Sequence, residues 1–330
     1  MARRATIHDV AAAAGVSVAT VSKAVNGRYG VASATVARVL DAVEALGYES
    51  SLVASSMRSR RTGVIGVLVA DFEPFSAEVL KGVGTALADY RYELLAYSGL
   101  SEQGWERRSL SRLSGTLIDA AIMVTPTVVG VTADVPIVAV DPHTGRADLP
   151  AVESDSFTGA FEAVSSLISL GHRRIGFLAG RPDLRSSAMR EAGYRRALSH
   201  AGIDYLPRLS AVGMYDADTV RSVARPLLLQ PEPPTAVFAA NDLSALALIE
   251  VATELGLNVP GDLSVVGFDD VPEASHGSAL PLSTVRQPIQ RLGAEAARML
   301  VSLMAGETLE RTHLILPTKF IPRATTAPPR

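Results

Sequence analysis

Four apolar runs in this chain each end in an acidic or amide side chain. The segment VLVAD ends at Asp71 and IVAVD at Asp141, and further along VFAAN ends at Asn241 and VVGFD at Asp269. Continuous apolar runs of this length are typical of buried parallel strands, and ligands bind beyond the carboxyl ends of such strands. Carboxylate and amide groups hydrogen-bond well to a polyhydroxylated small molecule. Together the four residues predict a ligand-binding cleft, although each alone could instead cap the next helix.

Further side chains are candidates for the same cleft. Arg190, in the segment MREAGYRRAL, lies near the start of a predicted helix and offers a forked hydrogen-bond donor. Asp242 and Asp270 directly follow two of the cleft residues, and we expect them to act as caps and supports. The aromatic residues that could offer a flat apolar face to a sugar ring are Phe72, Phe75, Trp105 and Tyr215, of which Phe75 and Tyr215 are the chosen candidates.

Catalytic and metal-binding patterns are missing from the sequence. Its six histidines are scattered, without the H-x-x-x-H or H-E-x-x-H spacing of a zinc site, and it contains no cysteine. There is no G-x-S-x-G nucleophile turn and no G-x-x-x-x-G-K phosphate loop. Gly82 and Gly84 lie within a helical pattern, so they do not form a dinucleotide fingerprint. We therefore expect no enzyme activity, no metal and no cofactor.

Two sheets are needed to bring the cleft residues together. From residue 64, apolar runs alternate with helical patterns, first in VIGVLVAD, YELLAYSG, AAIMVT and PIVAVD, then in IGFLAG, LSAVGM, AVFAAN and LSVVGFDD. The spacing predicts helices over about 77–90 and 106–117. Alternation of this kind indicates parallel sheets covered on both faces. The predicted fold class is α/β, with two doubly wound lobes.

The beginning of the chain has a different pattern, with short helices that are poor in large apolar residues. In TIHDVAAAAGVSVATVSKAVNG, residues 6–27, one helix is predicted to end at Gly15 and a second to begin after Ser17, a good N-cap. Asn26-Gly27 is expected to end the second helix. The predicted inward residues are Ile7, Val10, Ala11 and Ala14 in the first helix, and Val21, Ala24 and Val25 in the second.

A third helix is predicted over residues 33–46. Ser33 is expected to cap it and Gly47 to end it. Its predicted inward face consists of Val36, Val39, Leu40, Val43 and Leu46. Three short helices with so few apolar residues form a small core, as in a docking domain. Residues 50–63 then indicate a linker that becomes ordered only when it is held.

Charge is divided unevenly along the chain. The net charge is −3, yet residues 1–62 hold eight Lys or Arg against four Asp or Glu, leaving a net −7 on the rest. A basic head favours a polyanion as its partner, although a solvated basic surface is the simpler alternative. Hydrophobic residues make up 48% of the chain and charged residues 20%, as in ordered proteins. No segment has the pattern of a signal peptide or membrane span, so we expect a cytoplasmic location and no membrane partner.

The head and several later segments resemble the lactose-repressor (LacI/GalR) family of bacterial transcription regulators. The resemblance runs from TIHDVAAAAGVSVATVSKAVNG through VASATVARVLDAVEALGY, LGHRRIGFLAG and MREAGY to TAVFAANDLSALALIEVATELGLNVPGDLSVVGFDD, PLSTVRQP and LPTKFIPR. It implies an all-α helix-turn-helix domain over 1–49, a hinge helix or linker over 50–62, and a periplasmic-binding-protein-like core over 63–330. The implied lobes cover about 63–153 with 289–316, and about 154–288 with 317–330.

The resemblance also implies partners. Family members bind duplex DNA at near-palindromic operators, and a small-molecule effector binds between their lobes. For this chain the expected effector is a mono- or disaccharide. Some members add a C-terminal leucine-rich tetramerisation helix, whereas this sequence ends in ATTAPPR, so we expect a homodimer.

Roles in DNA binding are implied position by position. The second helix would enter the major groove, where Val18, Ala19 and Lys23 occupy the positions that choose bases. The residues implied to hold phosphates are Thr6, Ser17, Thr20, Ser22 and Asn26. Val18 and Ala19 have no group that hydrogen-bonds to a base edge, so readout would rest on Lys23 and on DNA shape.

The hinge departs from the family pattern. Family members commonly show Tyr-x-Pro-Asn and then Ala-Arg-x-Leu, and here Ser50 and Ser55 replace the proline and the arginine. Met57 stands where the family leucine wedges into the minor groove, and it is apolar enough for that role. In the effector cleft the matching positions are Asp71, Phe75, Asp141, Arg190, Tyr215, Asn241 and Asp269.

These features favour a repressor controlled by a small molecule, and two alternatives stay open. The first is a solute-binding receptor with an incidental basic head, against which the patterned head and the missing export signal argue. The second is a sugar-processing hydrolase that uses Asp141 and Asp269. The neighbouring pair Asp269-Asp270 is a poor catalytic dyad, because adjacent strand residues point in opposite directions.

Overall fold

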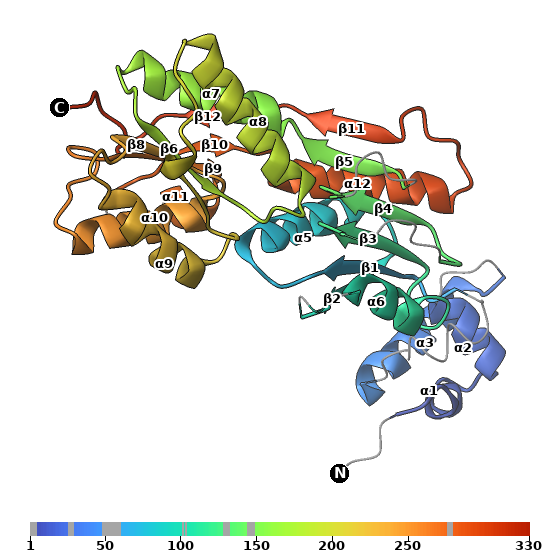
Figure 1. Cartoon of the computed structure of the whole chain (residues 1–330). Coiled ribbons are helices and arrows are strands. Elements are labelled where there is room, and N and C mark those ends of the chain that lie inside the picture. The colour runs from blue at the N-terminus through green and yellow to red at the C-terminus, as the bar shows by residue number, and fades with distance from the viewer. Residues whose placement is uncertain are drawn as a thin grey trace. The chain divides into compact units, whose positions relative to one another are not determined.

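The computed structural model of this chain describes residues 5–25, 30–47, 61–100, 102, 104–127, 133–143, 149–275 and 280–330. The chain divides into two compact units, Met1–Gly63 and Val64–Arg330, and the first of these is drawn in blue in Figure 1. Each unit has its own hydrophobic core. None of the helices in the described ranges is both long and apolar enough to cross a lipid bilayer.

The first unit contains three helices, α1 (Ile7–Ala14), α2 (Val18–Val25) and α3 (Ser33–Leu46). At the start of α1, Thr6 and Asp9 form a capping box, in which Asp9 accepts the Thr6 backbone N–H at 2.8 Å. Gly15 ends this helix with a φ of 64°, a conformation that favours glycine. Fully buried Val10, Val21 and Val39 join the three helices in one small core.

Two predictions for α3 are wrong. The N-cap is Ala32, which makes no side-chain capping hydrogen bond, and Ser33 is already the first helical residue. Leu40 and Leu46 are 49% and 39% exposed. The buried stripe passes through Val39, and Leu40 is about 100° away around the helix. Leu46 stands on the last turn of α3, so neither leucine joins the core cluster.

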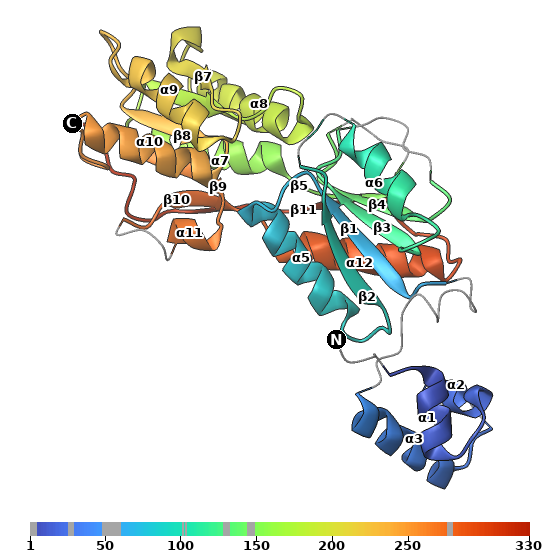
Figure 2. The same ribbon diagram turned by 90° about the horizontal axis from the view of Figure 1, so that it is seen from below.

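The second unit begins with a parallel sheet in the strand order β11-β5-β4-β3-β1-β2. Its strands are β1 (Val64–Val69), β2 (Glu93–Ser98), β3 (Ala120–Val124), β4 (Ile137–Val140), β5 (Ala151–Ser154) and β11 (His313–Leu316). Helices α5 (Pro74–Leu87) and α12 (Ile289–Met304) pack against each other on one face, as Figure 2 shows. Helix α6 (Trp105–Leu113) covers the other face, where Trp105 and Leu68 belong to the same core cluster.

A second sheet has the order β12-β10-β9-β8-β6-β7, and only the edge strand β12 runs antiparallel to its neighbour. Its strands are β6 (Ile175–Ala179), β7 (Ser210–Val212), β8 (Ala236–Ala239), β9 (Ser264–Asp269), β10 (Ser283–Arg286) and β12 (Lys319–Ile321). Its helices are α7 (Ser156–Ser169), α8 (Arg185–His200), α9 (Ala217–Leu228), α10 (Asp242–Glu254), α11 (Pro272–Ser275) and the 3-10 turn η1 (Pro207–Leu209). We call the parts built on the first and second sheets lobe 1 and lobe 2.

The chain passes between the lobes three times, after β5, after β10 and after β11. Two helices differ in their bounds from the predicted ranges. The helix predicted over about 77–90 is α5, Pro74–Leu87, and the one predicted over about 106–117 is α6, Trp105–Leu113. Pro74 occupies the first turn of α5, where its missing N–H is harmless. At the end of α6, Ser114 already has an extended backbone.

Glycines allow the close contact between α5 and α12. A Cβ atom added to Gly82 would lie 1.8 Å from the backbone oxygen of Gln290. One added to Gly293 would lie 2.2 Å from the backbone oxygen of Val79. Only glycine lets the two backbones approach this closely, so the α5–α12 pair is held in one packing arrangement.

Candidate functional site

A cavity of about 310 Å³ lies between the carboxyl ends of the two sheets and is lined by residues of both lobes. All seven cleft residues chosen from the sequence line it: Asp71, Phe75, Asp141, Arg190, Tyr215, Asn241 and Asp269. They meet there because parallel strands of one sheet end at the same edge, and the two edges face each other. We call this cavity the interlobe pocket.

Arg190 lies in the wall of the pocket and is only 4% exposed. One guanidinium nitrogen donates to the backbone oxygen of Ala240, and another lies 3.6 Å from Asp269 Oδ1. The guanidinium plane also stacks over the ring of Phe268, 3.8 Å from its centre. Its Nε atom is buried and has no hydrogen-bond partner among the described residues.

Asp269 joins the pocket to the crossing between the lobes. Its carboxylate accepts a hydrogen bond of 2.6 Å from Gln287, which directly follows β10. Burial raises the pKa of Asp269 to about 6, while the nearby Arg190 lowers it. The backbone of Asp269 has a φ of 120°, which is unusual for an aspartate and is typical of functional sites.

The other polar residues at strand ends differ in their surroundings. Asp141 is 7% exposed and has a φ of 50°, so its side chain enters the pocket from a tight turn after β4. Asn241 lines the pocket and also caps α10, because its side-chain oxygen accepts the Ser244 N–H at 2.9 Å. Asp71 is exposed and accepts the backbone N–H of Phe72 at 2.7 Å.

Only two of the four aromatic candidates line the pocket. Phe75 is 8% exposed and belongs to both the pocket and the core of lobe 1. Tyr215 packs closely on Gly180, where an added Cβ would lie 2.1 Å from the ring. Its buried hydroxyl has no well-aligned hydrogen-bond partner among the described residues, although Ser187 lies nearby. Trp105 is instead buried on the other face of the first sheet, and Phe72, 55% exposed, is not part of the lining.

Several lining residues were not predicted from the sequence, above all Glu73, His143 and Arg181. Glu73 and His143 stand two positions beyond Asp71 and Asp141, and Arg181 stands two positions beyond Ala179, the last residue of β6. Extending the search for polar side chains by two positions past each strand would have found them. The reason is that the loop after a strand runs along the rim of the same cleft.

Electrostatic surroundings shift the pKa values of two of these residues. Burial and the charge of Asp269 together raise the pKa of Glu73 to about 7, although a hydrogen bond from Ser76 opposes them. His143 is 6% exposed, and burial lowers its pKa, so the imidazole is neutral at pH 7. Neither ring nitrogen of His143 has a hydrogen-bond partner among the described residues.

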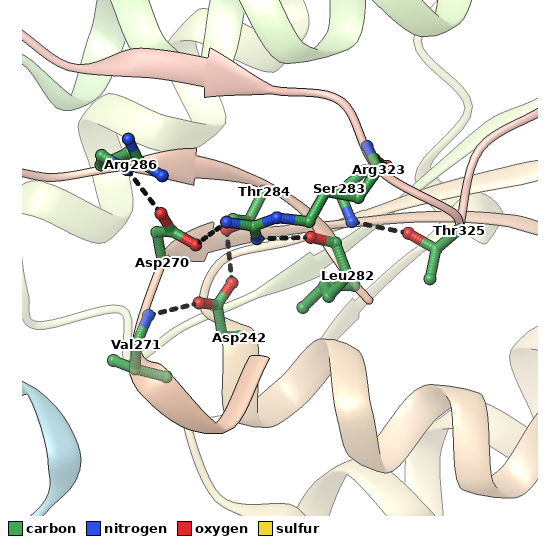
Figure 3. Close-up of polar contacts among 9 residues, drawn as sticks. All are labelled: Asp242, Asp270, Val271, Leu282, Ser283, Thr284, Arg286, Arg323 and Thr325. Carbon is green, nitrogen blue, oxygen red and sulfur yellow. Dashed lines mark hydrogen bonds and ion pairs between the residues drawn. The ribbon is translucent and has the colours of Figure 1, made fainter. Parts of the chain in front are cut away.

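Asp242 and Asp270 are not among the lining residues and act as supports, as predicted, whereas the predicted capping of α10 is done by Asn241. Figure 3 shows Asp242 accepting hydrogen bonds from the backbone N–H of Val271 at 3.0 Å and from the hydroxyl of Thr284. Asp270 pairs with Arg286 at 2.6 Å and with Arg323 of the C-terminal segment. These contacts hold the end of β9 against β10, and so fix the direction in which Asp269 points.

The candidate DNA-binding residues of the first unit surround α2. Ser17 caps this helix by accepting the Thr20 N–H at 3.1 Å, and the two hydroxyls lie 2.9 Å apart. Ala19 and Lys23 are exposed. The remaining described candidates are Thr6, which caps α1, Val18, which packs partly against the small core, and the half-buried Ser22. Asn26, Ser50, Ser55 and Met57 lie outside the described residues.

Comparisons with known proteins agree over both units. Residues 6–51 match the family described as bacterial regulatory proteins, lacI family, and residues 164–326 match the periplasmic binding protein-like domain. Catabolite control protein A of Priestia megaterium is 33% identical over 323 residues, which cover 96% of this chain and 97% of that protein. The HTH-type transcriptional regulator CelR of Thermobifida fusca is 35% identical over 336 residues, which cover 97% and 98%.

Solved structures give the same result. The transcriptional regulator CelR–cellobiose complex is 33% identical and covers 98% of this chain and 100% of its own, with a TM-score of 0.72. The lac repressor dimer bound to operator and the anti-inducer ONPF is 25% identical and covers 98% of this chain and 100% of its own, with a TM-score of 0.86. These relatives regulate transcription and are not enzymes. The chain therefore belongs to the LacI family, and it is a DNA-binding transcriptional regulator with a ligand-binding domain.

Proposed function

We propose that this regulator is a repressor whose affinity for its operator is controlled by a mono- or disaccharide in the interlobe pocket. The observation that carries the proposal is the convergence of seven strand-end, helix and aromatic side chains from two lobes on one cavity. Their carboxylate, amide and guanidinium groups suit sugar hydroxyls, and Phe75 and Tyr215 suit a sugar ring. The CelR–cellobiose complex, a relative with a bound sugar, supports the choice of ligand class.

On DNA, α2 enters the major groove of the operator. Ala19 and Lys23 reach base edges, and Val18 contributes less because it is partly buried against the head core. The phosphate-binding residues in this proposal are Thr6, Ser17, Thr20, Ser22 and Asn26. Met57 wedges into the minor groove from the hinge.

The working form of the protein is a homodimer in the bacterial cytoplasm. Two helix-turn-helix heads, residues 1–49, bind half-sites about one helical turn apart on near-palindromic DNA. Residues 50–62 connect them to the core, residues 63–330, in which sugar binding rearranges the lobes. This rearrangement changes how well the two heads fit both half-sites at once.

Mobility-shift assays on DNA fragments from the neighbourhood of the gene test the proposal. We expect one fragment to bind at least a hundredfold more tightly than random DNA of equal length at 150 mM salt. A panel of neutral mono- and disaccharides is then added, and we expect at least one sugar to shift the affinity. Binding to all fragments at the non-specific level would refute the regulator as proposed.

The same preparation separates the alternative functions. If a sugar binds tightly but never alters DNA affinity, the protein is a sugar receptor and the repressor mechanism is wrong. If chromatography detects a product from any bound sugar, Asp141 and Asp269 have the hydrolytic role considered from the sequence. Mass measurement by light scattering gives the oligomeric state, for which we expect twice the chain mass of 34.7 kDa.

A further inference from the structure

The charged residues that line the interlobe pocket are mostly acidic. The acidic side chains are Asp71, Glu73, Asp141, Asp216 and Asp269, against the two arginines Arg181 and Arg190. Asp141 and Asp269 are buried, so their charges are screened far less than those of the exposed Asp71 and Asp216. The pocket therefore carries a negative field before any ligand enters.

Both arginines already have acidic partners. Arg181 forms a two-point ion pair with Asp183, with nitrogen–oxygen distances of 3.1 and 2.7 Å. Arg190 lies 3.6 Å from Asp269 and is held on its other side by Ala240 and Phe268. A phosphate or carboxylate ligand would have to compete with these partners, and the partner would then stay in the pocket as an uncompensated charge.

Glu73 adds a carboxylate to the lining from lobe 1. It stands at the N-cap position of α5 in lobe 1, and its side chain makes no capping hydrogen bond. The groups whose charges act on it are Asp71 of its own lobe and Asp269 and Arg190 of lobe 2. Burial raises the pKa of Glu73 most, and the negative charges of Asp269 and Asp71 raise it further.

Apart from the Nε atom of Arg190, the side-chain polar groups of the lining that have no hydrogen-bond partner among the described residues are neutral. His143 lines the pocket and is only 6% exposed. Neither of its ring nitrogens has a hydrogen-bond partner among the described residues. The buried Tyr215 hydroxyl likewise has no well-aligned partner among those residues, although Ser187 lies nearby. A neutral imidazole offers one donor and one acceptor, and a phenol offers the same, which suits a hydroxyl group and does not compensate an anion.

We infer that the interlobe pocket selects an uncharged sugar and rejects its phosphorylated and carboxylated counterparts, with Glu73 as the residue that determines this discrimination. The inference rests on the proposed function, in which this pocket holds the effector. Sugar hydroxyls donate to the carboxylates of Glu73, Asp141 and Asp269, whereas a phosphate group has no proton to donate to most of them and brings charges of the same sign. Each close pair of a pocket carboxylate and a ligand phosphate or carboxylate weakens the binding of the charged ligand.

Matched ligand pairs test the inference on the full-length protein. Melting temperature and calorimetric titration are measured with glucose, galactose, mannose and ribose, and then with their phosphates and uronic or aldonic acids. Cellobiose and maltose are included as neutral disaccharides. We expect at least one neutral sugar to bind, and its charged counterparts to bind at least tenfold more weakly at pH 8.

The outcomes separate this inference from the proposed function. If a phosphate or acid binds as tightly as its neutral parent, the charge selection is wrong, and the sugar-controlled repressor survives. If no sugar of either kind binds while operator DNA is still bound, both the selection and the sugar effector are wrong.

Substitutions test the assignment to Glu73. Glu73→Gln keeps the size of the side chain and removes the charge, so we expect it to reduce the discrimination against the phosphate at least threefold at pH 8. Glu310→Gln, which removes an exposed carboxylate outside the pocket lining, is the matched control and leaves the ratio unchanged. A Glu73→Gln protein that binds the neutral sugar but keeps the full discrimination overturns the role of Glu73, because a purely structural residue would not alter the ratio.

Discussion

The carboxyl group of Glu73 titrates near pH 7 because burial and the charge of Asp269 both disfavour its ionised form. In the unfolded chain the same group has an ordinary pKa of 4.5. Between these two values the folded protein holds the proton and the unfolded chain has released it. The contribution of Glu73 to stability is therefore fully present below pH 4.5 and is lost as the pH rises toward 7.

Glu73→Gln should remove this dependence on pH. The wild-type free energy of unfolding should fall by about 1–3 kcal/mol more than that of the variant between pH 5 and 7.5. Urea unfolding of both proteins at four pH values measures the difference, with Glu310→Gln as the control. Equal pH profiles for Glu73→Gln and the wild type would show that Glu73 ionises normally in the fold.

Lys23 is the one positive charge on the exposed side of α2 that the structure describes. Lys23→Ala should weaken specific operator binding by about 1–3 kcal/mol if Lys23 contacts a base, because each good base contact has about that value. Lys319→Ala, which removes an exposed lysine from the other unit, is the control.

The contact made by Lys23 can be identified from the same titrations. Loss of discrimination between the operator and a mutated half-site indicates base readout. An equal loss on all sequences, with a smaller salt dependence, indicates a phosphate contact instead. Unchanged operator affinity would exclude Lys23 from the interface.

At the scale of elements, the size of the residues at a contact decides how closely two helices pack. Helices α5 and α12 approach each other at Gly82 and Gly293, where even one methyl group would overlap with backbone. The pair matters for function because α5 begins beside the pocket residues Glu73 and Phe75, while α12 begins directly after the crossing from lobe 2.

Gly82→Ala should therefore destabilise the fold by about 2 kcal/mol or more, because the two helices must separate. Gly84→Ala, on the exposed side of the same helix, meets no atom within 4 Å and should stabilise by about 0.5–1 kcal/mol. Thermal unfolding of both variants measures the contrast. If Gly82→Ala melts at or above the wild-type temperature, the helices are not packed as closely as described.

At the scale of the whole molecule, one hydrogen bond joins the interlobe pocket to the segment that crosses between the lobes. Asp269 faces Arg190 inside the pocket and accepts from Gln287, which lies between β10 of lobe 2 and α12 of lobe 1. A ligand that contacts Asp269 therefore acts on the segment that must move when the lobes rearrange.

Gln287→Ala should reduce the effect of the effector on DNA binding. For wild type we expect the sugar to change operator affinity by about 5- to 150-fold, the usual range for such coupling. In the variant we expect a change at least threefold smaller, with sugar-free operator affinity preserved. Gln230→Ala, which removes a side-chain amide that donates to the Arg208 backbone oxygen away from the pocket lining, should keep the full effect. An undiminished effect in Gln287→Ala would mean that coupling takes another route.

The sequence by itself determined much of this protein, because neighbouring residues decide which elements form and where polar groups follow them. The alternation of apolar runs and helical patterns predicted both parallel sheets, and strand ends predicted Asp71, Asp141, Asn241 and Asp269 as members of one cleft. Ser17 and Gly15 marked helix ends correctly, because capping depends on local backbone geometry.

Tertiary structure decided which face of each element is covered. Trp105 and Phe75 both follow apolar strands, yet their helices lie on opposite faces of the same sheet, and only Phe75 reaches the pocket. Leu40 fits the pattern of a buried face and is exposed, because the described core of the first unit packs on the side of α3 that carries Val39. The titration of Glu73 likewise depends on Asp269, which is almost 200 positions away in the chain. Such contacts depend on long-range packing, on which local sequence patterns carry no information.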